Sequence, residues 1–164
     1  MKPIKKMTTL LSLAVLWLCA CALEIEAPTS SANALRAEMI QQINSIRARG
    51  CRCGGELYSP APPLQWDERL ERAARRHAFD MSANDHFDHT GTDGSTTAQR
   101  VLEAGYDYRR IGENIAYGHP SLKSVIEDWL ASPEHCRNLM NPAYLEMGAA
   151  AKDGYWVQTL GLGR

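Results

Sequence analysis

Apolar residues recur at helical spacing along much of the chain. In the first such segment, Leu35, Met39, Ile43 and Ile46 lie three or four positions apart and predict a helix that stops at Gly50. Side chains able to cap a helix mark the start of several later segments. The predicted helices are residues 33–49, a helix from near Asp67 to near Asn84, residues 96–104, a helix capped by Ser121, and a short helix begun by Ser132-Pro133.

The strands predicted by the pattern lie mostly late in the chain. They are residues 111–116, 147–152 and 155–160, and the last two flank Asp153-Gly154, a strong hairpin signal. Residues 85–95 are polar and glycine-rich and predict a loop. Because helices cluster early and strands late, we expect an α+β fold rather than a doubly wound sheet.

The N-terminus has the pattern of an export signal. Lys2, Lys5 and Lys6 precede a short apolar run, residues 10–18, which is too short to span a bilayer but suits a signal peptide. Leu18-Cys19-Ala20-Cys21 resembles a bacterial lipobox, in which Cys21 becomes the lipidated first residue. Ala20-Cys21-Ala22 also satisfies the small-x-small rule of ordinary secretion, so release without a lipid stays open.

These signals divide the chain into three parts. We assign residues 1–21 to a lipoprotein-type signal peptide, 22–32 to a polar tether and 33–164 to one compact domain. The expected location is the cell envelope, at the outer membrane or in the periplasm, with the membrane contacted through the N-terminal lipid. Without lipidation the protein is expected to be secreted.

Composition narrows the class of partner. Hydrophobic residues make up 45 % and charged residues 23 % of the chain, as in an ordinary globular protein. The formal net charge is −1, and no basic stretch alternates with aromatic residues. We therefore do not expect a nucleic-acid partner.

Three cysteines follow the signal segment: Cys51, Cys53 and Cys136. An exported protein occupies a compartment that permits disulfides, so one bond and one free thiol is the economical interpretation. A zinc site built on Cys51-x-Cys53 is the alternative, although this spacing is not the usual one and a second cysteine pair is lacking.

His89, Glu113 and His135 are the candidate chemical residues, because each lies in a loop or at the edge of an element. Imidazole and carboxylate groups bind zinc-like metals, and the same groups transfer protons near neutral pH. His77 lies on the apolar stripe of its helix, so we interpret it as a hydrogen-bonded core histidine. His86 would share a helical face with His89, but the loop character of residues 85–95 argues against that pairing.

Six motifs in a fixed order resemble the bacterial branch of the CAP superfamily, the SCP-like extracellular domain. The match extends over about residues 35–161, which is nearly all of the mature chain. The motifs are Pro63-Leu64-x-Trp66-Asp67-x-x-Leu70, Ala73-x-x-x-His77, Phe87-x-His89-Thr90-Gly91, Gly112-Glu113-Asn114-Ile115-Ala116, Trp129-x-x-Ser132-Pro133-x-His135 with Asn138-x-x-Asn141-Pro142, and Tyr155-Trp156-x-Gln158.

The resemblance implies a three-layer α-β-α sandwich with a cleft where His89, Glu113 and His135 meet. We expect His89 and His135 to lie within ligand distance of one divalent ion such as zinc, with Glu113 near enough to orient a histidine or to hold a bound water. The resemblance also implies a disulfide between Cys53 and Cys136, with Cys51 free. Animal and fungal relatives carry a second glutamate where this chain has Ser132, so the full set of four cleft residues is absent. Glu134 is a neighbour in sequence that does not match the motif position.

Three functions follow, and family membership does not choose among them. The favoured one is an envelope binding module whose cleft takes a metal and a small, lipid-like or cell-wall ligand. The second is a hydrolase that uses the histidines and Glu113, either directly or through a metal-activated water. It lacks an obvious nucleophile, since there is no Gly-x-Ser-x-Gly motif. The third is a structural or partner-binding domain in which these residues form a polar network.

Overall fold

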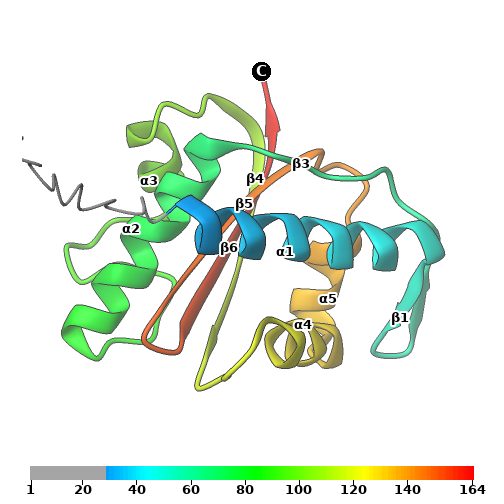
Figure 1. Ribbon diagram of the computed structural model, residues 1–164. Helices are drawn as coiled ribbons and strands as arrows, with labels where there is room; N and C mark the ends of the chain where they lie inside the picture. The colour runs from blue at the N-terminus through cyan, green and yellow to red at the C-terminus, as the bar shows by residue number, and fades with distance from the viewer. Residues whose placement is uncertain (1–28) are drawn as a thin grey trace, which may run out of the picture.

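A four-stranded sheet with the strand order β3-β5-β6-β4 forms the middle layer of the fold (Figure 1). The computed structural model describes residues 29–164. The strands are β3 (Gln65–Trp66), β4 (Tyr108–Tyr117), β5 (Glu146–Lys152) and β6 (Tyr155–Gly163). Strand β3 is parallel to β5, whereas β4 and β5 are each antiparallel to β6.

Helices cover both faces of this sheet. Helices α2 (Glu68–Asn84) and α3 (Thr97–Glu103) pack on one face, and α1 (Thr29–Arg49), α4 (Leu122–Ala131) and α5 (Pro133–Met140) pack on the other (Figure 1). The predicted α+β class and three-layer α-β-α sandwich are therefore confirmed.

The sheet separates two apolar cores because side chains alternate along each strand. On β6, Tyr155 and Val157 join the core beneath α2, whereas Trp156 and Leu160 join the larger core beneath α1 and α4. Both faces of β6 are buried, which agrees with its place inside the sheet.

Strand β5 approaches α2 very closely at Gly148. A Cβ atom at this position would collide with the backbone of Leu70 and Glu71. Only glycine lets the helix backbone lie this near to the strand.

The helix caps predicted at Asp67, Ser121 and Ser132 are present, and Thr96 is a fourth cap that was not predicted. Asp67, Thr96, Ser121 and Ser132 are the N-cap residues of α2, α3, α4 and α5, and each side chain accepts a hydrogen bond from a backbone N–H of the first turn. The predicted loop over residues 85–95 is also observed.

The structure differs from the prediction near the start of the domain. Helix α1 begins at Thr29 instead of residue 33, so it includes the end of the segment expected to be a tether. Those four residues carry no apolar periodicity to reveal a helix. The predicted signal peptide, Cys21 and tether residues 22–28 lie outside the described residues. Within residues 29–164, no helix is both long and apolar enough to cross a bilayer.

Three short strands were not predicted. Strands β1 (Cys51–Cys53) and β2 (Glu56–Tyr58) form a separate two-stranded hairpin that turns at Gly54-Gly55, and β3 adds two residues to the main sheet. Segments this short do not show the alternation of apolar and polar residues that identifies a strand.

A buried arginine holds the end of α1 against two loops. Arg47 is fully buried, and its guanidinium donates hydrogen bonds to the carbonyl oxygens of Pro62, Leu139, Asn141 and Tyr144 at 2.6–3.1 Å. Burial lowers the pKa of Arg47 to about 10, so the side chain keeps its charge at neutral pH. Backbone carbonyl oxygens alone therefore satisfy a buried cation here.

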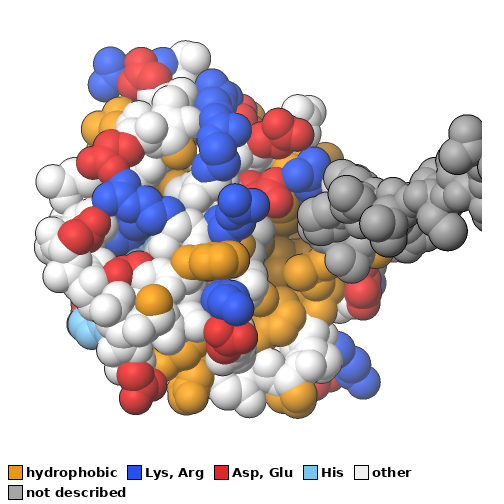
Figure 2. All heavy atoms as spheres, turned by 60° about the vertical axis from the view of Figure 1, so that its left-hand side comes forward, with side chains coloured by type: hydrophobic (Ala, Val, Ile, Leu, Met, Phe, Trp, Pro, Cys, Tyr) orange, Lys and Arg blue, Asp and Glu red, His pale blue; other side chains and the backbone are white. Residues whose placement is uncertain are grey.

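Charges of both signs are interspersed on the side of the molecule where α2 and α3 lie (Figure 2). Arg69 pairs with the capping residue Asp67, and Arg76 pairs with Asp93 and Glu103. The positive charges of these two arginines are therefore balanced locally.

Candidate functional site

Glu113 lies at the centre of the candidate site. It is on β4 and only 8 % exposed, and each of its carboxylate oxygens has a partner. Oε1 is 2.8 Å from Nδ1 of His89, and Oε2 accepts a hydrogen bond of 2.9 Å from Nη2 of Arg100. The structure thus brings the predicted residues His89 and Glu113 into direct contact.

Arg100 is a site residue that the sequence analysis missed. It is 2 % exposed, and its guanidinium also donates to the carbonyl oxygens of His89 (2.9 Å) and Ser95 (2.7 Å). One side chain therefore neutralises Glu113 and also binds the loop backbone at His89 and at Ser95. No sequence signal distinguished this arginine from the others on predicted helices.

The groups around Glu113 favour the charged form of its carboxylate. Burial alone would raise the pKa of Glu113, but the hydrogen bond from His89 and the positive charge of Arg100 outweigh it and lower this pKa. The same hydrogen bond to Glu113 raises the pKa of His89 against the opposing effect of burial. Glu113 is therefore ionised at neutral pH and directs the His89 ring through Nδ1, leaving Nε2 as the ring atom available to a ligand.

His77 supports this arrangement from the core. It is fully buried on α2, with Nε2 2.9 Å from the carbonyl oxygen of Asp88 and 4.0 Å from Oε1 of Glu113. Burial lowers the pKa of His77, so the ring is neutral at pH 7. The prediction of a hydrogen-bonded core histidine is confirmed.

His135 lies in the first turn of α5, which Ser132 and Pro133 begin. Its Nδ1 is buried and has no hydrogen-bond partner among the described residues. Burial lowers the pKa of His135, and the charge of His89 lowers it further, so the two rings interact electrostatically. His135 makes no hydrogen bond to Glu113 within residues 29–164.

Amide side chains connect α5 to the sheet behind these residues. Asn114 donates to the carbonyl oxygen of His135 (3.2 Å) and to Oε1 of Gln158 (3.0 Å). Asn138 donates to Oδ1 of Asn114 (3.0 Å) and to the carbonyl oxygen of Glu113 (3.3 Å). These bonds fix the backbones of Glu113 and His135 relative to each other.

Three neighbours in sequence have other roles. Ser132 accepts a hydrogen bond from the backbone N–H of His135, as the helix cap it was predicted to be. Glu134 has a side chain that is 86 % exposed and pairs with Arg137, so it does not replace the absent second acid. His86 contacts the carbonyl oxygen of Thr90 within the loop and does not share a helical face with His89.

The side chains of the candidate site offer a metal two ligands rather than three. Across residues 29–164, the group of three side chains with ligand atoms within 4.8 Å of one another is Cys51, Cys53 and Cys136, not His89, Glu113 and His135. Both Glu113 oxygens are already bonded to His89 and Arg100. The donors that fit a metal at the candidate site are therefore the two imidazoles, with Glu113 orienting His89 from behind, a common arrangement for metal-binding histidines.

The predicted disulfide is confirmed. Cys53 and Cys136 are bonded, with Cα atoms 5.3 Å apart, and Cys51 is a free thiol. The bond links β1 to α5 directly beside His135.

Comparison with known proteins agrees with this architecture. YkwD of Bacillus subtilis, an uncharacterized protein, is 34 % identical over 86 residues, or 52 % of this chain and 34 % of YkwD. An extracellular protein with an SCP domain from Bacillus anthracis has a TM-score of 0.70 and 26 % identity over 79 % of this chain and 40 % of that one. NaASP2, solved with Zn²⁺, has a TM-score of 0.53 and 17 % identity over 77 % of this chain and 78 % of that one, which shows the fold alone.

This chain spans only 28–34 % of the length of the curated relatives that it matches. The family model described as the cysteine-rich secretory protein family, CAP, matches residues 33–160, which include the whole candidate site and all or most of every element of the sandwich. The chain therefore belongs to the CAP family.

Proposed function

We propose that this protein is an exported envelope module that binds a divalent metal through His89 and His135. The observation that carries the proposal is the bond between His89 Nδ1 and the buried carboxylate of Glu113, because it presents Nε2 as a preoriented ligand atom. The unpartnered Nδ1 of His135 supports it, since a buried imidazole nitrogen normally has a partner. When bound, the ion would supply open coordination positions for water or an anionic ligand.

We expect the affinity for the metal ion to be modest, because the protein supplies only two ligands and Arg100 neutralises the charge of Glu113. Because protons compete with the metal, affinity falls as the pH drops through the raised pKa of His89. NaASP2, which shares the fold, was solved with Zn²⁺, and this supports metal binding by a protein of this fold.

Calorimetric titration with Zn²⁺ at pH 7.5 and 5.5 tests the proposal. A Cys51→Ser background removes the free thiol, which would otherwise bind zinc itself. We expect binding that weakens at pH 5.5 and is lost in His89→Ala/His135→Ala but kept in His86→Ala, a matched control in the same loop. If the double variant binds as well as its parent, the metal lies elsewhere and the residues form a structural network around Glu113.

Two exposed aromatic rings, Phe87 in the loop that carries His89 and Tyr117 at the end of β4, suit a lipid-like or cell-wall ligand. Phe87 and Tyr117 are 51 % and 53 % exposed, with ring centroids 6.2 Å apart. Exposed rings are natural contacts for the apolar faces of lipids and sugars. We expect Phe87→Ser/Tyr117→Ser to weaken binding to phosphatidylglycerol vesicles or to purified cell-wall sacculi. Unchanged binding to both would remove these rings from the ligand site.

Lipidation of Cys21 is proposed as the membrane anchor. The motif Leu18-Cys19-Ala20-Cys21 supports it, and Ala22 lacks the aspartate that retains lipoproteins at the inner membrane of Gram-negative cells. Mass spectrometry of the mature N-terminus tests the proposal. A diacylglyceryl group on Cys21 is expected, whereas an unmodified chain that starts at Leu23 would exclude the anchor.

A further inference from the structure

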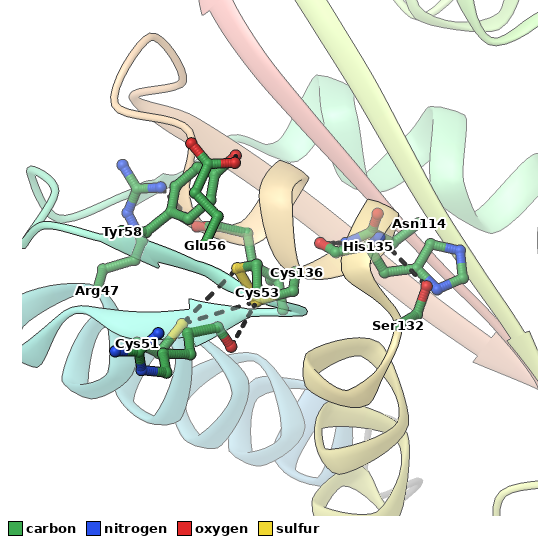
Figure 3. Close-up of a disulfide and its surroundings, with 11 residues drawn as sticks. Arg47, Cys51, Cys53, Glu56, Tyr58, Asn114, Ser132, His135 and Cys136 are labelled. Atoms are coloured by element: carbon green, nitrogen blue, oxygen red, sulfur yellow. Dashed lines mark hydrogen bonds between the residues drawn. A yellow bond between two sulfur atoms is a disulfide. The ribbon is translucent and has the colours of Figure 1, made fainter.

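Three sulfur atoms meet where the β1–β2 hairpin contacts α5 (Figure 3). Beside the Cys53–Cys136 bond, Sγ of Cys51 lies 3.7 Å from Sγ of Cys136 and 3.9 Å from Sγ of Cys53. Cys51 and Cys53 are two residues apart on β1, so both side chains leave the same face of the strand. The free thiol is therefore already in contact with the disulfide.

The three sulfurs differ in their access to solvent. Cys53 and Cys136 are 2 % and 0 % exposed, so a small thiol in solution does not reach the disulfide directly. Cys51 is only partly buried. Any electron exchange between this disulfide and solvent must therefore pass through Cys51 or await unfolding.

We propose that Cys51, Cys53 and Cys136 form a thiol–disulfide exchange centre that takes low-molecular-weight thiols as its substrates. In the first step Cys51 loses its proton to solvent, and its thiolate attacks Sγ of Cys136. The Cys51–Cys136 bond forms, the Cys53–Cys136 bond breaks, and Cys53 leaves as a thiolate that takes up a proton. No oxidant or reductant is consumed.

The geometry of β1 allows both bonds. Because Cys51 and Cys53 project from the same side of β1 toward α5, forming the new bond requires Cys51 Sγ to swing from its place beside the Cys53–Cys136 bond into line with that bond. Its distance from Cys136 Sγ must also shorten from 3.7 Å to about 2 Å. Burial raises the pKa of the Cys51 thiol, so the protonated form persists beside the disulfide at neutral pH.

The second step opens the centre to solvent. An external thiolate attacks the partly exposed Sγ of Cys51, forms a mixed disulfide with it and expels Cys136 as a thiolate, which takes up a proton. A second external thiol then displaces the first from Cys51. Two external thiols become one disulfide, and the protein disulfide becomes two thiols.

Reduction kinetics of the folded, processed protein test the centre, with dithiothreitol as the thiol. We expect Cys51→Ser, which retains the Cys53–Cys136 bond, to be reduced about tenfold more slowly than wild type or slower still. Ser45→Ala, at an exposed position on α1, is the control and should match wild type. Rates for Cys51→Ser within about twofold of wild type would overturn the proposal, because the buried bond would then be reached without Cys51.

Peptide mapping gives an independent test, because trypsin cleaves after Arg52 and separates Cys51 from Cys53. Wild type incubated at pH 8, acid-quenched and alkylated should yield Cys136 peptides bonded to Cys53 in one fraction and to Cys51 in another. Both species, with the free cysteine alkylated in each, support the exchange. Finding only the Cys53–Cys136 species after long incubation would overturn it.

Discussion

The guanidinium of Arg100 lies 2.9 Å from the carboxylate of Glu113, and both side chains are buried between α3 and β4. Because the same guanidinium binds the carbonyl oxygens of His89 and Ser95, one ion pair connects the candidate metal ligand to the sheet. Neither partner can be removed alone without leaving an uncompensated charge in the interior.

We expect Arg100→Met to lower the free energy of unfolding by about 3 kcal/mol, since it leaves the Glu113 carboxylate buried beside His89 alone. Urea denaturation with a metal chelator in the buffer measures this loss of stability. Adding Glu113→Gln to Arg100→Met should restore part of it, because the buried charge is then absent. A double variant that is less stable than Arg100→Met would contradict the ion-pair account.

Arg47→Met should be comparably destabilising. The substitution leaves the carbonyl oxygens of Pro62, Leu139 and Tyr144 without their donor, and each unsatisfied buried carbonyl costs about 1–3 kcal/mol. Arg49→Met is the matched control, because Arg49 lies on the same helix and bonds only Ser45 within residues 29–164. Thermal unfolding should show a large fall in midpoint for Arg47→Met and almost none for Arg49→Met. Equal shifts would mean that helix propensity, not the carbonyl contacts, determines the effect.

Gly148→Ala is expected to cost about 2 kcal/mol or more, because the new methyl group pushes β5 away from the backbone of α2. Gly55→Ala, at a hairpin position with open space around it, serves as the comparison and should be close to neutral. Denaturant midpoints of the two variants decide the matter. A stable Gly148→Ala would show that the helix can shift without loss.

The pH dependence of stability should show opposing contributions from two histidines. Burial lowers the pKa of His77 below its ordinary value of 6.5. The neutral His77 ring therefore stabilises the folded protein above pH 6.5, and this stabilisation is lost as the pH falls through the folded-state pKa of His77. The pKa of His89 is raised by Glu113, so its contribution is present below pH 6.5 and is lost as the pH rises through its folded-state pKa.

Urea denaturation between pH 5 and pH 8, with a chelator present, measures these slopes. His77→Gln should remove much of the loss on the acid side while lowering stability at pH 8, where the neutral ring is well accommodated. His86→Gln, in the neighbouring loop, should leave the profile unchanged. An unchanged acid-side slope in His77→Gln would mean that other groups control it.

Much of the architecture was predictable because local sequence patterns mark where the helices of this chain begin. Asp67, Thr96, Ser121 and Ser132 are capping residues followed by apolar stripes, and each begins a helix in the structure. The C-terminal hairpin at Asp153-Gly154 was equally clear. Strands β1, β2 and β3 were missed because segments of two or three residues are too short to show the alternation of a strand, and β3 forms only by pairing with the distant β5.

The candidate site was only partly predictable, for the same reason. His89 and Glu113 were identified from the family motifs that contain them, and the disulfide from the cysteine arrangement. Arg100 and Arg47 carried no such signal. Whether an arginine is buried depends on tertiary packing, and its sequence neighbours do not show it. The two oxygens of Glu113 are bonded to His89 and Arg100 and so are not free to bind a metal. These contacts likewise depend on the packed structure.

The strand order has a consequence for how the chain reaches this structure. Strands β5 and β6 lie at the centre of the sheet, and β3 and β4 pair only with them. Until residues 146–163 have been synthesised, β3 and β4 have no partner, and the helices before them have no sheet to cover. Folding must therefore wait for the end of the domain, and a growing chain exposes its apolar helix faces until the last hairpin closes.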